Sequence, residues 1–297
     1  MMRSPGRVAT AVRRQDGAIV WQEKPFISVT RKVKPLGWPV VRGAVVLIEA
    51  MSLGISSLSY AADEAAREPG EAAPAPGEKK TSWFSALVLP LTVAASLVLG
   101  FLAFFALPLW LTGLFHLRSS LGFNLVDGVF RLAIFLLYLW GIGRWSEMQR
   151  VFEYHGAEHK TIHALEAGVE LTPENVQQFS RFHPRCGTSF LLIVMLLSIV
   201  VFSLLGKPEN WLQRVERFLF IPVIAGVGFE FVRLSAKYSS LRPVAWLIQP
   251  GLDLQKLTTR EPSMDQLEVA ITALKAVWNE ETAAMAPDAA LAAACEG

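Results

Sequence analysis

The sequence predicts a mainly α-helical membrane protein with about four transmembrane helices, a small N-terminal β-hairpin element and a cytoplasmic helical insert. The 297 residues are 52% hydrophobic and only 18% charged, whereas a typical soluble domain has about 25% charged residues. Charge is depleted in four segments, each close to the roughly 20 residues that a helix needs to cross a bilayer. Buried helices of a soluble protein are the alternative, but two segments carry no charge, which favours an integral membrane protein. The four segments are 86–107, 124–143, 188–205 and 218–234.

Basic residues predict the orientation of these spans. With four crossings, the parts of the chain on one side carry 22 Lys and Arg, and those on the other side carry 4. Basic loops stay in the cytoplasm, so both termini and the insert are expected there. The polar N-terminus shows no cleavable signal peptide. The net charge of +2 is too small to indicate nucleic-acid binding, and cytoplasmic Cys186 and Cys295 are not expected to form a disulfide.

The first 60 residues are expected to form a β element followed by an interfacial helix. Alternation at Val8, Thr10 and Val12, a turn at 15–17 and an apolar return predict a hairpin over residues 7–26.

Residues 40–60 are apolar but contain Arg42 and Glu49, which are seven positions apart and share a helix face. We therefore expect this helix to be interfacial or half inserted and to pack against the spans. A fifth crossing is the alternative. It would place the basic hairpin outside, against the charge distribution.

The composition of residues 61–82, rich in Ala, Pro, Glu and Gly, predicts a disordered linker. Pro108 is expected to end or kink the first span. The order after the linker is two spans (83–143), the cytoplasmic insert (144–187), two further spans (188–236) and a cytoplasmic tail (237–297).

Cap residues divide the insert and the tail into helices. In the insert, Gly168 is expected to close a helix over 144–167, and Thr172 with Pro173 starts a short helix that ends near Phe182. In the tail, Ser263 and Gln266 form a capping-box pattern before an amphipathic helix that ends near Asn279. That helix is expected to pack on the rest of the cytoplasmic part.

Three histidines of the insert recur at four-residue intervals: His155, His159 and His163. On a helix they share one arc of roughly 80°. The embedded H-x-x-E-H includes Glu158 and is the inverzincin pattern, two metal-binding imidazoles beside a carboxylate base. His155 and His163 are about 12 Å apart along the axis, so one ion cannot take both. The pair His155 and His159 encloses Glu158 and is preferred, which leaves His163 as a supporting or separate residue.

A catalytic zinc site usually has three protein ligands, so a third must come from elsewhere. His183 and Cys186 follow the short helix, and Cys186 precedes a span whose helix dipole favours thiolate. Glu230 is an ionisable residue within a span and is the other candidate, although an ion pair with Arg233 explains it equally well. A polar helix face that holds its histidines in water is the alternative to any metal site.

Longer stretches resemble a known family. Four stretches carry this resemblance: EYHGAEHKTIHALEAG, LTPENV, RFHPRCGTSF and LTTREPSMDQLEVAITALKAV. They resemble the YqhQ-like family, bacterial membrane proteins of unknown function described as predicted metal-dependent enzymes. The resemblance covers nearly the whole chain except 61–80 and implies a bacterial plasma (inner) membrane protein. Family members carry a glycine-containing segment ahead of the MMRSP that opens this chain, which suggests that Met1 is a late-assigned start. The residues that it singles out are His155, Glu158, His159, His183, Arg185 and Cys186.

These observations favour a divalent metal, most simply zinc, bound by His155 and His159. In a metal-dependent hydrolase Glu158 would activate water and Arg185 would stabilise a developing oxyanion; the substrate would be a peptide or a lipid head group. The alternative is a non-catalytic scaffold or assembly factor that binds a cytoplasmic protein partner. A metal transporter would need more polar residues within its spans. The sequence gives no indication of oligomeric state.

The predicted orientation can be tested at Cys295. A membrane-impermeant thiol reagent should fail to label Cys295 in intact cells and should reach it after lysis, because the tail is expected in the cytoplasm. Labelling in intact cells would contradict the orientation.

Overall fold

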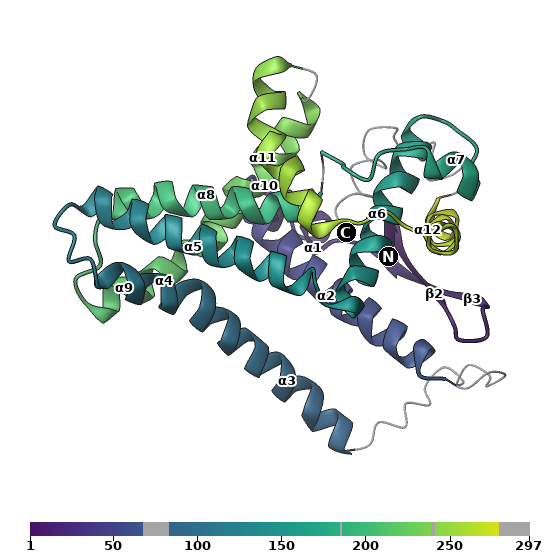
Figure 1. Cartoon of the computed structure of the whole chain (residues 1–297), viewed down its shortest axis with the longest axis horizontal. Helices are drawn as coiled ribbons and strands as arrows, with labels where there is room; N and C mark the ends of the chain where they lie inside the picture. The colour runs from purple at the N-terminus through teal and green to yellow at the C-terminus, as the bar shows by residue number, and fades with distance from the viewer. Residues whose placement is uncertain (68–82, 185, 239–240, 279–297) are drawn as a thin grey trace.

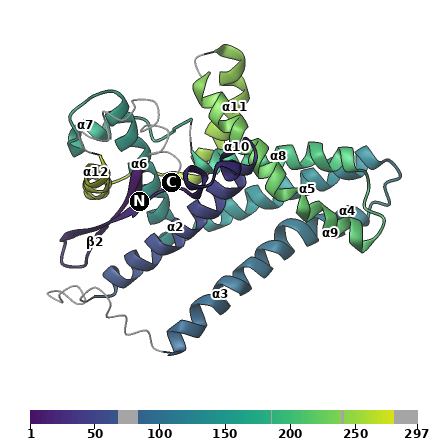
Figure 2. The same cartoon turned by 180° about the vertical axis from the view of Figure 1, so that it is seen from behind.

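A computed structural model describes residues 1–67, 83–184, 186–238 and 241–278 of the chain (Figure 1). It is mainly α-helical with one small antiparallel sheet near the N-terminus, so the predicted fold class is confirmed. Long apolar helices form one part. The sheet and the shorter polar helices gather at the other end (Figures 1 and 2).

The sheet has three strands, β1 (Met2–Ser4), β2 (Gly6–Arg13) and β3 (Ile19–Phe26), in the order β1-β2-β3. Strands β2 and β3 form the predicted hairpin, with Val12 opposite Val20. Gly17 takes a φ of 85°, which a glycine adopts without strain. Strand β1, which pairs with β2, was not predicted.

Short helices α1 (Val29–Lys32) and η1 (Lys34–Gly37) lead into α2 (Val41–Ala65). Helix α2 therefore includes residues 61–65, which were expected in the linker; residues 68–82 of that prediction lie outside the described part of the chain.

The two ends of α2 contact different parts of the molecule. At its N-terminal end Arg42 forms an ion pair with Glu230 of α10 (Ile221–Lys237). At its C-terminal end Ser57 accepts a hydrogen bond from Thr10 of β2 at 2.8 Å, and Glu64 pairs with Arg14 just after that strand. Helix α2 thus links the membrane bundle to the sheet.

Within the described part of the chain, five helical segments are long and apolar enough to cross a membrane: Val41–Ala65, Pro90–Gly113, Ser120–Ile142, Gly187–Leu205 and Leu212–Ser235. They indicate a bilayer environment. Four overlap the predicted spans, and the fifth is α2. Two glycines allow α8 (Gly187–Leu205) to approach its neighbours closely: Gly128 of α5 (Ser120–Ile142) lies against Ile199, and Gly228 of α10 (Ile221–Lys237) lies against Val194.

The first predicted span is a composite helix. It consists of α3 (Trp83–Phe101), a π-helical segment η2 (Leu102–Ala106) and α4 (Leu107–Gly113), while α9 (Trp211–Leu219) precedes α10. Pro108 stands in the first turn of α4, directly after the π-helical segment, and the helical path continues past it. Helix α3 diverges from α5 and α8 (Figures 1 and 2).

The insert contains α6 (Ser146–Glu166) and α7 (Pro173–Gln177), and the tail contains α11 (Arg242–Thr258) and α12 (Met264–Val277). The predicted caps are present: Gly168 has a φ of 66° after α6, Thr172 caps α7, and Ser263 forms a capping box with Gln266. Helix α7 is shorter than predicted. Helix α11 was not predicted, and it includes Pro250, a residue that ordinarily breaks a helix.

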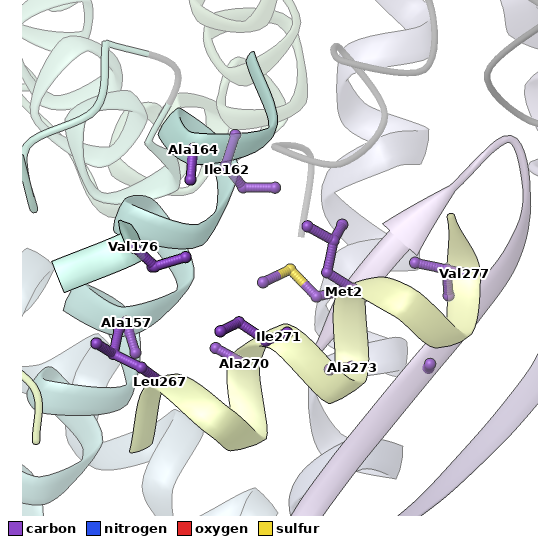
Figure 3. Close-up of a cluster of buried hydrophobic side chains, with 12 residues drawn as sticks. Met2, Ala157, Ile162, Ala164, Val176, Leu267, Ala270, Ile271, Ala273 and Val277 are labelled. Atoms are coloured by element: carbon purple, nitrogen blue, oxygen red, sulfur yellow. The ribbon is translucent and has the colours of Figure 1, made fainter. Parts of the chain in front are cut away.

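One hydrophobic cluster joins the sheet, α6, α7 and α12, although these elements are far apart in the sequence (Figure 3). Leu267 and Leu274 of α12 and Met2 of β1 are fully buried in it. The N-terminal element, the insert and the tail helix therefore form one packed body, which we call the polar-end unit. The buried members of its core are Met2, Ala9, Ala157, Ile162, Ala164, Val176, Leu267, Ala270, Ile271, Ala273, Leu274 and Val277.

The segment after α11 passes directly over α6. Arg260 N–H donates to Phe152 O at 2.9 Å, and its guanidinium donates to Gly143 O at 2.8 Å. A Cβ at Gly156 would lie 2.1 Å from Arg260 O. Only glycine allows this approach, and Gly156 directly follows His155.

We predict that Gly156→Ala destabilises the protein by about 1–3 kcal/mol, because the added methyl group forces α6 away from the 260 segment. Thermal unfolding of the detergent-purified protein measures the effect. Gly54→Ala in α2 is the control, since a Cβ there meets no atom within 4 Å and should stabilise the helix slightly. Equal stability of both variants would contradict the close contact.

Candidate metal centre

The histidine face of α6 meets the chain that leads into α8. His155 and His159 lie with ring centroids 4.4 Å apart. His183, which precedes α8, lies 5.7 Å from His159 and 4.7 Å from His163. Four of the five histidines of the chain are therefore gathered in the polar-end unit; His116 lies between α4 and α5.

Backbone carbonyl groups orient three of these rings. His155 Nδ1–H donates to Thr258 O at 2.8 Å, and His159 Nδ1–H donates to Arg181 O at 2.6 Å. In both residues Nε2 is then the nitrogen that is left for a metal ion. His163 is held the other way round, through Nε2–H to Phe182 O at 2.9 Å, so its Nδ1 remains.

Cys186 completes a group with the first two histidines. Its Sγ lies 3.3 Å from His155 Nε2, and the ligand atoms of His155, His159 and Cys186 all lie within 4.8 Å of one another. A tetrahedral zinc with ordinary Zn–S and Zn–N bonds separates sulfur and nitrogen by about 3.5 Å. This group could hold a metal ion.

The electrostatics of this group favour a thiolate. Burial raises the pKa of the Cys186 thiol, but the hydrogen bonds and charges of His155 and His159 outweigh it and bring that pKa well below its ordinary value. Burial lowers the pKa of His155, but its hydrogen bond to Cys186, with the charges of Cys186 and Glu158, raises it to about 9. These opposite pKa shifts favour a thiolate–imidazolium pair of Cys186 and His155, and the thiolate is the form that binds metals.

A second group lies beside the first. Glu166 Oε1 is 3.6 Å from His183 Nε2, and Glu166 Oε2 is 3.9 Å from His163 Nδ1. These three residues also offer ligand atoms within 4.8 Å of one another. Burial lowers the pKa of His183, Glu166 counteracts this, and the neighbouring His163 and His159 lower the pKa further.

Helix α11 positions both groups, and sequence reasoning did not identify its role. Gln255, fully buried, accepts from His183 N–H at 2.8 Å and donates to His183 O at 2.7 Å. Thr258 supplies the carbonyl that orients His155. The contacting residues are 72 and 103 positions apart, and no local pattern indicates such pairs.

The structure places the predicted site residues as follows. His155, His159 and Cys186 come together. Cys186 is therefore the predicted third ligand that joins the histidine pair. His183 lies next to this group but belongs to the second one.

Glu230 forms an ion pair with Arg42 of α2 and is in neither group. The sequence analysis did not identify Arg42 as its partner. Glu158 is half-buried and its charge acts on His155. Arg185 lies outside the described residues.

Comparisons with known proteins agree on one family. The family model described as "Protein of unknown function (DUF1385)" matches residues 38–280. The chain is 35% identical over 273 residues to "Uncharacterized protein YqhQ" of Bacillus subtilis (strain 168), covering 88% of this chain and 84% of that protein. No solved structure matches the chain.

Proposed function

We propose that this chain, which belongs to the DUF1385 family, is a bacterial plasma-membrane protein that holds zinc on His155, His159 and Cys186. One observation carries the proposal: two imidazoles present Nε2 to a thiolate while backbone carbonyls take both Nδ1–H groups. Metal-ligating histidines are ordinarily oriented in this way, because the outer hydrogen bond selects the tautomer and aims the ring.

The donor set favours zinc over the common alternatives. One thiolate and two imidazoles suit zinc, whereas magnesium and calcium prefer oxygen ligands. Three protein ligands leave one position of a tetrahedron for water or substrate, which is the arrangement of catalytic zinc sites.

Hydrolysis is the reaction that these residues fit. When bound, zinc supplies a Lewis acid that lowers the pKa of water to about 7. The carboxylate of Glu158, close enough to act on the pKa of His155, would take the proton. Cys186 directly precedes α8, so the site lies at the end of a span and would meet a lipid head group or a membrane-bound peptide.

Packing of the polar-end unit supports the cytoplasmic placement of both termini. Met2, Ala157 and Leu267 belong to one core, so the N-terminal sheet, the insert and the tail helix lie on the same side of the membrane. A complete fifth crossing by α2 would put the sheet on the opposite side from the insert. The contacts therefore favour α2 as a half-inserted helix, and the basic-residue distribution places this side in the cytoplasm.

We predict that purified wild-type protein contains stoichiometric zinc and that His159→Ala and Cys186→Ser each lose the ion of this site. Mass spectrometric metal analysis measures the content. Glu158→Gln should keep the zinc but abolish the cellular function, since Glu158 acts as base and not as ligand. Wild-type protein without zinc would overturn the site, and an unimpaired Glu158→Gln strain would favour a scaffold.

We predict that zinc affinity rises about tenfold per pH unit from pH 7 and levels off near pH 9. The pKa of His155, about 9, means that this residue carries a proton below that pH, and zinc must displace it. Glu158→Gln removes a charge that raises this pKa, so its plateau should begin at lower pH. Competition with a chromophoric chelator measures the affinities, and Glu174→Gln, an exposed change on α7, is the control. A pH-independent affinity would contradict the thiolate–imidazolium pair.

A further inference from the structure

We infer that the polar-end unit holds a second divalent cation, on His163, Glu166 and His183, and that this ion has a structural role. The two histidines come from different segments, α6 and the chain before α8, and Glu166 is the last residue of α6. A tetrahedral ion with bonds of about 2.0–2.1 Å separates its nitrogen and oxygen ligands by about 3.3 Å. The observed separations of 3.6 and 3.9 Å need only a small movement of Glu166.

Hydrogen bonds hold the ring of His163 and the backbone of His183 in place. His163 gives its Nε2–H to Phe182 O, which leaves Nδ1 on the side of Glu166. The backbone of His183 is fixed on both sides by Gln255, and its side chain is 2% exposed. A backbone carbonyl thus orients His163, as carbonyls orient His155 and His159 in the first group, although the bond is made by the other ring nitrogen.

The two groups would bind two separate ions. They share no residue, and their nearest rings, His159 and His183, have centroids 5.7 Å apart. His159 and His163 differ by four residues, or about 6 Å along the helix axis. Each ion would therefore be held by its own set of side chains.

The second ion affects the first site through the chain between α7 and α8. His183 and Cys186 lie three residues apart in this chain. An ion that ties His183 to His163 and Glu166 fastens the chain to α6 and so keeps Cys186 next to His155. The second site also lacks a thiolate. Its two imidazoles and one carboxylate accept cobalt, manganese, iron or zinc, whereas the thiolate of the first site selects zinc more strongly.

Metal stoichiometry of the full-length protein in detergent tests the inference. We expect two ions per chain in the wild type and one in Glu166→Gln and in His163→Asn, both partly exposed positions that tolerate polar replacements. After exchange with Co²⁺, these variants should still show the thiolate-to-cobalt charge-transfer absorption of Cys186, but they should need a higher Co²⁺ concentration than the wild type to reach it, because no second ion holds Cys186 next to His155. Cys186→Ser should also hold one ion but lack that absorption. Glu170→Gln, an exposed change just beyond α6, is the matched control and should keep two ions.

The outcomes separate this inference from the proposed function, on which it does not depend. One ion in the wild type that persists in Glu166→Gln and is lost in Cys186→Ser would overturn the second site alone. One ion that is lost in Glu166→Gln and His163→Asn but persists in Cys186→Ser would support the second site and overturn the first. No ion in the wild type would overturn both.

Discussion

Burial of the apolar face of α12 is the interaction on which the polar-end unit depends. Leu267 and Leu274 lie between the sheet and α6, and removal of their apolar surface from water is the main favourable free energy that joins three distant segments. Ala157 and Ala164 face this core from the side of α6 roughly opposite His155 and His159. The same helix is thereby anchored on one face and presents its histidines on the other.

This packing has a consequence for the membrane part. An apolar core cannot form across a bilayer, so elements that share one lie on the same side. Helix α2 contacts the sheet through Ser57 and Glu64, and it forms an ion pair with α10 through Arg42. One end of this helix therefore contacts the polar-end unit, and the other end contacts a membrane helix. Its hydropathy alone does not distinguish it from a crossing helix. Its partners do.

The candidate metal centre depends on backbone geometry more than on its residue types. Each of His155, His159 and His163 is oriented by a carbonyl from a different place in the chain: Thr258, Arg181 and Phe182. These bonds decide which nitrogen faces Cys186 or Glu166, and so they divide four histidines between two groups. Gly156 makes the arrangement possible because it lets the 260 segment lie directly on α6.

The sequence by itself determined the helical membrane class, the hairpin, the caps at Gly168, Thr172 and Ser263, and the pairing of His155 with His159, because all of these follow from periodicity and spacing within one element. The tertiary structure decided which partners join them. It brought Cys186 to the first histidine pair, His183 to the second group, and Glu230 to Arg42. It also revealed α11, whose Gln255 side chain makes two hydrogen bonds to the backbone of His183. Such contacts join residues whose separation along the chain carries no local signal, since they form only when packed helices bring their faces together.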